Sequence, residues 1–442
     1  LRIITNKPDP SAFDAWVDVG AHTLTDGDTG FDVSGMVNIP LAGDKAALRL
    51  VGFQSEEAGY IDNVLGNAPV GPIYPRGREG TFDNSEFVKE DVNSTTTSGA
   101  RASLRWFPSE EWTVDVGAIF QNVDQDGFGD TDLDEANGFY AAESIGDWEQ
   151  LRFEEDSFED DWYQLALTLE GEIGGAEVVF ASSYLKRDTF YKADATSYLA
   201  GWQERYTPKW NDFDDPYECF YEFYAGRACF AIYDFYPSQN PRAQVLSDGE
   251  SERTSFELRV ATPSDSDSRW SGIIGAFYNK TESSSQFASN VEGLDQSGAQ
   301  SFQFYYDGEY VTYFFGGAHF YLNYIAFYYN CGTGPEYAND CTYPVAPSVN
   351  WWQGVYDDTL KQVAIFGEFG FDVTENFNIT AGGRWYDIEI DRKLAQGSLA
   401  GGLTDYRAMP DLLNCLPANP DGFKGGDLCY QNTVSQSDES GF

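Results

Sequence analysis

Hydrophobic and polar residues alternate with a period of two over eleven stretches of this chain. In the first stretch, polar residues and a glycine or tryptophan fill the even positions between the apolar residues Phe13, Ala15, Val17, Val19 and Ala21. This period is typical of a β-strand with one apolar face. The eleven predicted strands are 13–21, 31–39, 47–53, 100–106, 112–120, 161–170, 176–186, 255–261, 270–280, 362–371 and 377–390.

The connections between these strands alternate between short and long. The short ones are rich in Gly, Pro, Asp or Ser, as hairpin turns require, and lie at 41–46, 107–111, 171–175, 262–268 and 372–376. The long ones are 58–97, 124–160, 188–251, 283–360 and the tail from 392, with 24–29 as one short member of that set. Tight turns at one end and long loops at the other are typical of an outer-membrane β-barrel, with its loops outside the cell.

The two faces of the strands predict different surroundings. Leu165, Leu167 and Leu169 are expected to face lipid, whereas the lumen is expected to be lined by Arg101, Arg105, Asp115, Glu257 and Arg259. Trp16 and Met36 interrupt the polar face. An interfacial girdle is predicted from Trp106, Trp112, Trp162, Trp270 and Trp385. A soluble β-sandwich or propeller also alternates, but neither needs one-sided loops of this size.

Composition narrows the classes of partner. The formal charge is -45, from 72 Asp+Glu against 27 Lys+Arg, so nucleic acid is a poor partner because little would neutralise its phosphates. The aromatic content of 16% argues for an ordered chain. The sequence contains no run of 18 apolar residues, which is the length that indicates a transmembrane helix. The opening LRIITNKPDP lacks the features of a signal peptide, and we expect it to be an internal piece of a longer precursor.

Six cysteines form three close pairs in the long loops. The pairs predict three local disulfides, Cys219–Cys229, Cys331–Cys341 and Cys415–Cys429, and therefore an oxidising compartment. The spacing does not match zinc sites, and unpaired reduced thiols are the alternative.

Enzymatic motifs are missing from the sequence. His22 and His319 are the only histidines, and no GxSxG, HExxH or phosphate-binding glycine loop occurs. Paired carboxylates are too common here to single out a glycosidase site. We therefore expect no enzymatic activity and no cofactor, with the exception of calcium in one loop.

That loop is the acidic stretch VDQDGFGDTDLDE, from Val123 to Glu135. Counted from Asp124, it places acids and a glycine as an EF-hand-type loop does, but Phe128 stands where an oxygen ligand is expected. No flanking helices are predicted. The candidate ligands of a possible calcium site are Asp124, Asp126, Asp130, Asp132 and Glu135, with an ordinary solvated loop as the alternative.

The densest aromatic segment runs from Phe302 to Asn330. A platform for a siderophore, sugar or other amphipathic solute is predicted from Tyr305, Tyr306, Tyr310, Tyr313, Phe314 and Phe315. The alternative is that these residues extend strands above the membrane and pack on one another, because aromatic residues favour strands. A second aromatic cluster at 219–236 has the same two interpretations.

Three segments also resemble a known family, the TonB-dependent outer-membrane receptors. LRIITNKPDP loosely resembles the end of the plug domain, through Ile4, Thr5, Lys7 and Pro8. The segment 255–280 resembles the family's E-L-R strand, turn and G-x-x-Y strand, through Glu257, Leu258, Arg259, Gly275 and Tyr278. The segment 362–389 resembles the A-x-F-G-E strand, D-x-T turn and G-x-R-Y strand, through Ala364, Phe366, Gly367, Glu368, Asp372, Thr374, Gly383, Arg384 and Tyr386. The motifs occur in the family's order.

The resemblance implies an all-β, antiparallel, up-and-down transmembrane barrel of which about 11 of 22 strands are present. It implies that 1–12 end the plug and its linker and that 13–442 form an incomplete barrel in the outer membrane of a Gram-negative bacterium. The implied function is uptake of a scarce ligand, foremost an iron–siderophore, else a saccharide or vitamin. Implied partners are a TonB-type protein acting through a plug, outer-membrane lipid and lipopolysaccharide, and a small-molecule ligand. A passive porin-like or adhesive barrel is the alternative, and a soluble secreted β-protein a weaker one.

Overall fold

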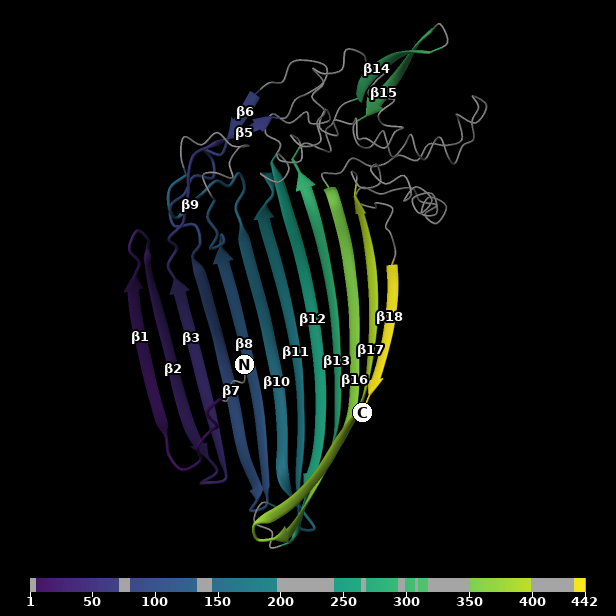
Figure 1. Ribbon diagram of the computed structural model, residues 1–442. Helices are drawn as coiled ribbons and strands as arrows, with labels where there is room; N and C mark the ends of the chain where they lie inside the picture. The colour runs from purple at the N-terminus through teal and green to yellow at the C-terminus, as the bar shows by residue number, and fades with distance from the viewer. Residues whose placement is uncertain are drawn as a thin grey trace.

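A computed structural model shows one large antiparallel sheet with smaller strand pairs at one end (Figure 1). The structure describes residues 5–70, 80–132, 145–196, 242–263, 268–292, 299–306, 309–316, 350–398 and 433–441. The large sheet has twelve strands in the order β1-β2-β3-β7-β8-β10-β11-β12-β13-β16-β17-β18. Each strand pairs with the next in that order, so the predicted up-and-down meander is confirmed.

All eleven predicted strands are present in the sheet. They are β1 (Asp14–Thr23), β2 (Thr29–Leu41), β3 (Ala46–Glu57), β7 (Thr95–Ser109), β8 (Trp112–Asp126), β10 (Ser157–Ile173), β11 (Ala176–Asp194), β12 (Ala243–Ala261), β13 (Trp270–Val291), β16 (Asn350–Thr374) and β17 (Phe377–Ser398). Four of the five short turns also fall where predicted, and the fifth, 262–268, lies only in part within the described residues. At 174–175 both glycines have positive φ angles, 62° and 77°, which a two-residue hairpin turn with the twist of its strands requires.

The strands extend further toward the long loops than the alternation predicted. For β16 the predicted range 362–371 becomes Asn350–Thr374, and β8 continues past Gln121 to Asp126. In these extensions apolar and polar residues no longer alternate regularly, so the sequence pattern ends before the backbone pairing does. The predicted limits of the long loops were wrong for this reason.

The twelfth strand, β18 (Thr433–Gly441), was not predicted. Its sequence TVSQSDESG has no apolar alternation and lies in the tail from 392, which the sequence predicts to be a long connection. In the structure it pairs with β17 from Tyr386↔Gly441 to Leu394↔Thr433. The strand therefore depends on backbone pairing with its neighbour rather than on an apolar face.

The register of the ladders separates the two faces of the sheet. Leu165, Leu167 and Leu169 stand on the face that also carries the large exposed apolar side chains Val116, Ile274 and Ile365. We call this the apolar face. The opposite face carries Asp115, which aligns through Thr168 and Ala181 with Glu257. This polar face contains all five predicted lumen residues, so the predicted division is confirmed.

The predicted girdle of tryptophans is partly wrong. Trp106, Trp112 and Trp270 lie on the apolar face near the turn end of the sheet. Trp162 is paired with Gln121 and Arg187 and therefore stands on the polar face. In β10 the even-numbered residues lie on this face, and the odd-numbered ones, such as Leu165, lie on the apolar face. Trp385 lies on the apolar face opposite Ile365, within the strand rather than at its end.

Six short strands form pairs at the loop end of the sheet (Figure 1). They are β4 (Asp62–Asn63) with β9 (Glu149–Gln150), β5 (Asn67–Val70) with β6 (Gly80–Asp83), and β14 (Ala299–Tyr306) with β15 (Glu309–Gly316). Among the described residues, no helix is long and apolar enough to cross a membrane.

Candidate functional site: the polar wall and the cap

The polar face of the sheet carries oriented ion pairs between neighbouring strands. Arg105 donates two hydrogen bonds of 2.8 Å to Asp115. Arg187 binds Asp160 in the same forked geometry at 2.7 and 2.8 Å, and Arg392 binds Asp358 at 2.8 Å twice. Two parallel bonds fix the plane of each guanidinium. The wall is therefore charged, with these guanidinium groups held in defined positions.

The N-terminal segment runs along this polar face. Arg101 Nη2 donates to Thr5 Oγ1 at 2.5 Å, and Lys7 Nζ lies 3.3 Å from Asp115 Oδ2. Asn38, which is 1% exposed, accepts from the Asp9 amide and donates to the Asp9 and Ala12 carbonyls. Residues 5–12 are thus attached to the polar wall before β1 begins.

Two long connections fold together into a compact unit at the loop end. We call this unit, made of the described residues of 58–94 and 127–156, the cap. Buried asparagines replace regular strand pairing inside it. Asn63 Nδ2 donates to the carbonyls of Phe87 and Arg152, and Asn63 Oδ1 accepts from the Arg152 amide at 2.7 Å. Asn84 likewise donates to the carbonyls of Val64 and Arg152.

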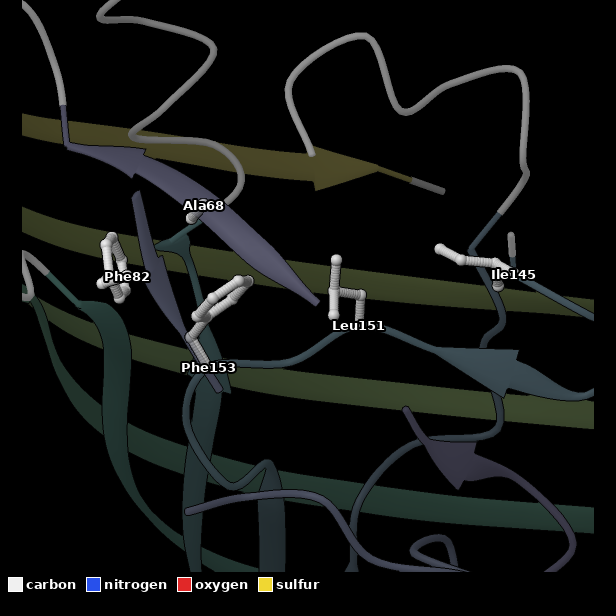
Figure 2. Close-up of a cluster of buried hydrophobic side chains, with 5 residues drawn as sticks. All are labelled: Ala68, Phe82, Ile145, Leu151 and Phe153. Carbon is white, nitrogen blue, oxygen red and sulfur yellow. The ribbon is translucent and has the colours of Figure 1, made fainter. Parts of the chain in front are cut away.

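The cap also has its own apolar core (Figure 2). Side chains from β5, β6 and the segment around β9 face one another, namely Ala68, Phe82, Ile145, Leu151 and Phe153. The Phe82 and Phe153 rings meet edge to face with their centroids 5.1 Å apart. Buried amides and a core of this kind hold the two connections in one arrangement, although they are far apart in the sequence.

Arg152 is the ionic centre of the cap. Its side chain is 13% exposed and binds Asp130 at 2.8 Å, Asp132 at 2.9 Å and Asp156 at 3.1 Å. These carboxylates keep Arg152 charged, and its pKa lies above the ordinary arginine value despite burial. Sequence analysis did not single out Arg152, because a lone arginine before FEED carries no pattern of its own.

The predicted calcium ligands are divided by this arrangement. Asp124 and Asp126 belong to β8, whereas Asp130 and Asp132 are bound to Arg152. Glu135 lies outside the described residues. Within the part of the chain that the structure describes, no three His, Cys, Asp or Glu side chains are placed to hold one metal ion. The calcium site stays a prediction, and calcium would have to compete with Arg152 for two of its ligands.

Two further carboxylates attach the cap to the loop end of β11. Asp194 accepts from the Phe153 and Thr196 amides, and its own amide donates to Asp156 at 2.6 Å. Burial raises the pKa of Asp194 to about 6, although these hydrogen bonds oppose the shift. Burial also raises the pKa of Asp156. The attachment is therefore sensitive to protonation in the acidic range.

The cap presents an aromatic pair on its surface. Tyr60 and Trp148 meet edge to face with centroids 5.5 Å apart, and the Trp148 side chain remains 57% exposed. Trp148 has a φ of 64°, which is uncommon for a bulky residue. Its carbonyl accepts from the Asp62 amide, and Asn93 accepts from the Tyr60 amide. The scaffold thus holds a large ring outward at a conformational cost.

The other predicted site residues are placed only in part. Tyr305 is paired with Tyr310 in the β14–β15 hairpin, while Tyr313 is paired with Phe302 and Phe314 with Ser301. This hairpin is a separate two-stranded sheet, so these aromatic residues do not extend the strands of the large sheet. The three cysteine pairs, the second aromatic cluster and His319 lie outside the described residues. The ligand platform and the disulfides stay predictions.

Comparisons with known proteins place the fold. No family model and no curated protein matches the chain. Among solved structures, the chain is similar to the ferric yersiniabactin uptake receptor FyuA from Yersinia pestis, with a TM-score of 0.53 and 10% identity over 99% of this chain. It is also similar to the ferric citrate transporter FecA, with a TM-score of 0.48 and 8% identity over 99% of this chain, and to FpvAI in its complex with pyocin S2, with a TM-score of 0.45 and 12% identity over 88%.

The chain spans 44% of the FyuA chain, 42% of FecA and 43% of FpvAI, which is less than half of each. The likeness to FyuA extends over nearly the whole of the present chain and agrees with the meander, the one-sided loops and the two-faced sheet. The chain therefore has the antiparallel barrel fold of the TonB-dependent outer-membrane receptors.

Proposed function

We propose that this protein forms part of the wall and the outer loops of a receptor in the Gram-negative outer membrane. In this proposal the receptor takes up a scarce extracellular ligand, foremost an iron–siderophore, with energy from a TonB-type protein. The observation that carries the proposal is the two-faced sheet with a folded cap at one end only. An apolar face toward lipid and a charged face toward the lumen are what a large barrel requires.

The cap supports an outward orientation of the loop end. Tight turns close the opposite end of the sheet, and in outer-membrane barrels such turns face the periplasm. The cap is rigid enough to present side chains to a ligand, because buried amides and the Arg152 ion pairs hold it together. We therefore place ligand capture at the cap and at the neighbouring loops.

The N-terminal segment favours the receptor over a passive channel. Thr5 and Lys7 are bound to Arg101 and Asp115 on the polar wall, so chain that precedes β1 occupies lumen space. This is the arrangement expected if residues 1–12 end a plug domain and 13–442 form the barrel. An open porin-like channel has no need of such a segment.

For the ligand, the exposed Tyr60–Trp148 pair offers a surface for a flat or amphipathic solute. FyuA, to which this chain is similar in fold, is an uptake receptor for ferric yersiniabactin. Iron chelates are therefore the first class to test here, with saccharides and vitamins next. The absence of enzymatic activity stays a prediction.

The test is growth of a deletion strain on a panel of single iron and carbon sources. We expect the loss of growth on one source, restored by the wild-type gene. We expect Trp148→Ala to restore growth only at raised ligand concentration, because a stacked ring contributes to capture. Leu65→Ala is the matched control, since Leu65 is an exposed apolar cap residue, 59% exposed, without a ring.

Two outcomes separate the alternatives. Uptake of one solute that persists without TonB would favour a passive channel. Unchanged uptake of every solute in the deletion strain would reject the transport proposal and favour an adhesive surface barrel.

A further inference from the structure

The segment that precedes β1 is held to the wall by one buried side chain. Asn38 Oδ1 accepts from the Asp9 amide at 2.9 Å, and Asn38 Nδ2 donates at 2.8 Å to the carbonyls of Asp9 and Ala12. We call these three hydrogen bonds the anchor. Asn38 is 1% exposed, so water cannot readily replace its partners. The anchor therefore fixes both backbone groups of Asp9 to β2.

The sequence around Asp9 makes the anchored chain stiff. Pro8 and Pro10 flank Asp9, and a proline ring fixes its own φ and restricts the residue before it. Pro8 is also buried. Asp9 Oδ1 accepts from the amide and the hydroxyl of Ser11 at 2.8 and 2.6 Å, which closes an Asx turn. Little length can therefore be drawn out of this part of the chain while the anchor holds.

The upstream residues of the segment are attached more weakly. Arg101 Nη2 donates to Thr5 Oγ1 at 2.5 Å and to the Asn6 carbonyl at 3.4 Å, and Lys7 Nζ lies 3.3 Å from Asp115. The three segment residues are exposed, and the Lys7 side chain is 53% exposed. Exposed pairs of this kind contribute little, because water competes for both partners. These contacts will therefore break before those of the anchor.

Detachment of residues 5–7 affects the two wall residues differently. Asp115 keeps its two hydrogen bonds of 2.8 Å from Arg105. Arg101 loses both of its acceptors in the described part of the chain, because both belong to the segment. The Arg101 guanidinium is then open to the lumen. The position of the anchor therefore decides how much of the wall a moving chain uncovers.

We propose that the anchor is a mechanical stop for the chain that precedes β1. Under load from the upstream side, residues 5–7 detach from the polar wall, and residues 9–12 stay in place. The chain from Thr5 to Asp9 spans at most about 14 Å when extended, so this length limits how far Thr5 moves from the anchor. The inference rests on the proposed function only for the source of the load, a TonB-type protein that acts through a plug.

Single-molecule force spectroscopy on the full-length protein in lipid nanodiscs tests the stop without any solute. The N-terminus is pulled while the lipid holds the barrel, and the contour length locates the residue at which the chain resists. We expect the wild-type chain to resist at Asp9. In Asn38→Ala the resistance should move to Asp14, the first residue of β1, which lengthens the contour by about 17 Å. Asn38→Leu keeps the side-chain volume without the hydrogen bonds and should give the same shift.

Hydrogen exchange provides a second measurement on the same proteins. Asn38→Ala leaves the Asp9 amide without its acceptor, so peptides that cover 8–14 should exchange roughly ten- to a hundredfold faster. Lys7→Gln is the matched control, because it removes an exposed contact of the same segment. Its stop should remain at Asp9, and its exchange should change by less than about fivefold.

Three outcomes would overturn the proposal. The wild-type chain could already resist at Asp14, or both Asn38 variants could keep the wild-type contour length. Resistance upstream of Asp9 that disappears in Lys7→Gln would show that the exposed contacts carry the load instead. Growth on the solute that does not depend on TonB would reject the proposed function, and it would leave the measured position of the stop unaffected.

Discussion

Replacing Arg152 with methionine should open the cap while leaving the sheet intact. Methionine keeps much of the side-chain volume, and the Arg152 backbone bonds to Asn63 and Asn84 remain possible. The substitution leaves Asp156, with a side chain 2% exposed, without its cation. Removing one partner of a buried ion pair costs about 3–5 kcal/mol. Most of this cost falls on Asp156, because Asp130 is 60% exposed and can be solvated.

Hydrogen exchange of the full-length protein in detergent measures this cost. A loss of about 3–5 kcal/mol in local opening corresponds to faster exchange by roughly two to more than three orders of magnitude in peptides that cover 145–156. Peptides from β12 and β13 should not change. Arg392→Met is the control, because it removes an equally forked pair that is much more exposed, 56% and 35%.

A second variant tests whether the unpaired charge of Asp156 causes the loss of protection. Arg152→Met/Asp156→Asn should recover part of the protection, because no unpaired charge remains and the asparagine oxygen can still accept from the Asp194 amide. Wild-type exchange in Arg152→Met would show that the ion pairs do not hold the cap. Equal loss in the single and the double variant would show that packing rather than charge is responsible.

Three further predictions concern the same region. Asn63→Ala should destabilise the cap by about 2–3 kcal/mol, because the Arg152 amide and the Phe87 carbonyl lose their partners while the Arg152 carbonyl keeps only the bond from Asn84, and faster exchange at 145–156 would reveal it. Asp194 has a raised pKa of about 6, so its protonated form favours the folded cap; cap stability should fall as pH rises from roughly 4 to 7, and this slope should disappear in Asp194→Asn. Millimolar calcium should slow exchange around 124–132 if the predicted site forms, and an equal lack of effect in wild type and in Asp126→Ala would reject that site.

The alternation of apolar residues predicted the strands wherever one face is apolar and the other polar. It failed where apolar and polar residues do not alternate, as in the outer half of β16 and in β18, since backbone pairing there needs no regular apolar face. The sequence also could not show on which face Trp162 lies, because an aromatic residue near a strand end can occupy either face. Its pairing with Gln121 in the ladder places it on the polar face.

The candidate site, too, was predicted from the sequence only in part. Sequence identified the acidic loop and the charged wall residues, because their composition is distinctive. It could not show that Asp130 and Asp132 bind Arg152, because their geometry depends on how two connections fold against each other.

The sequence by itself therefore determined the antiparallel sheet and its two faces, because an apolar face repeats at every second residue along each strand. Only the tertiary structure decided the cap, its Arg152 ion pairs and the Tyr60–Trp148 pair. Each of these depends on contacts between segments that are distant in the sequence, and a local sequence pattern cannot predict such contacts.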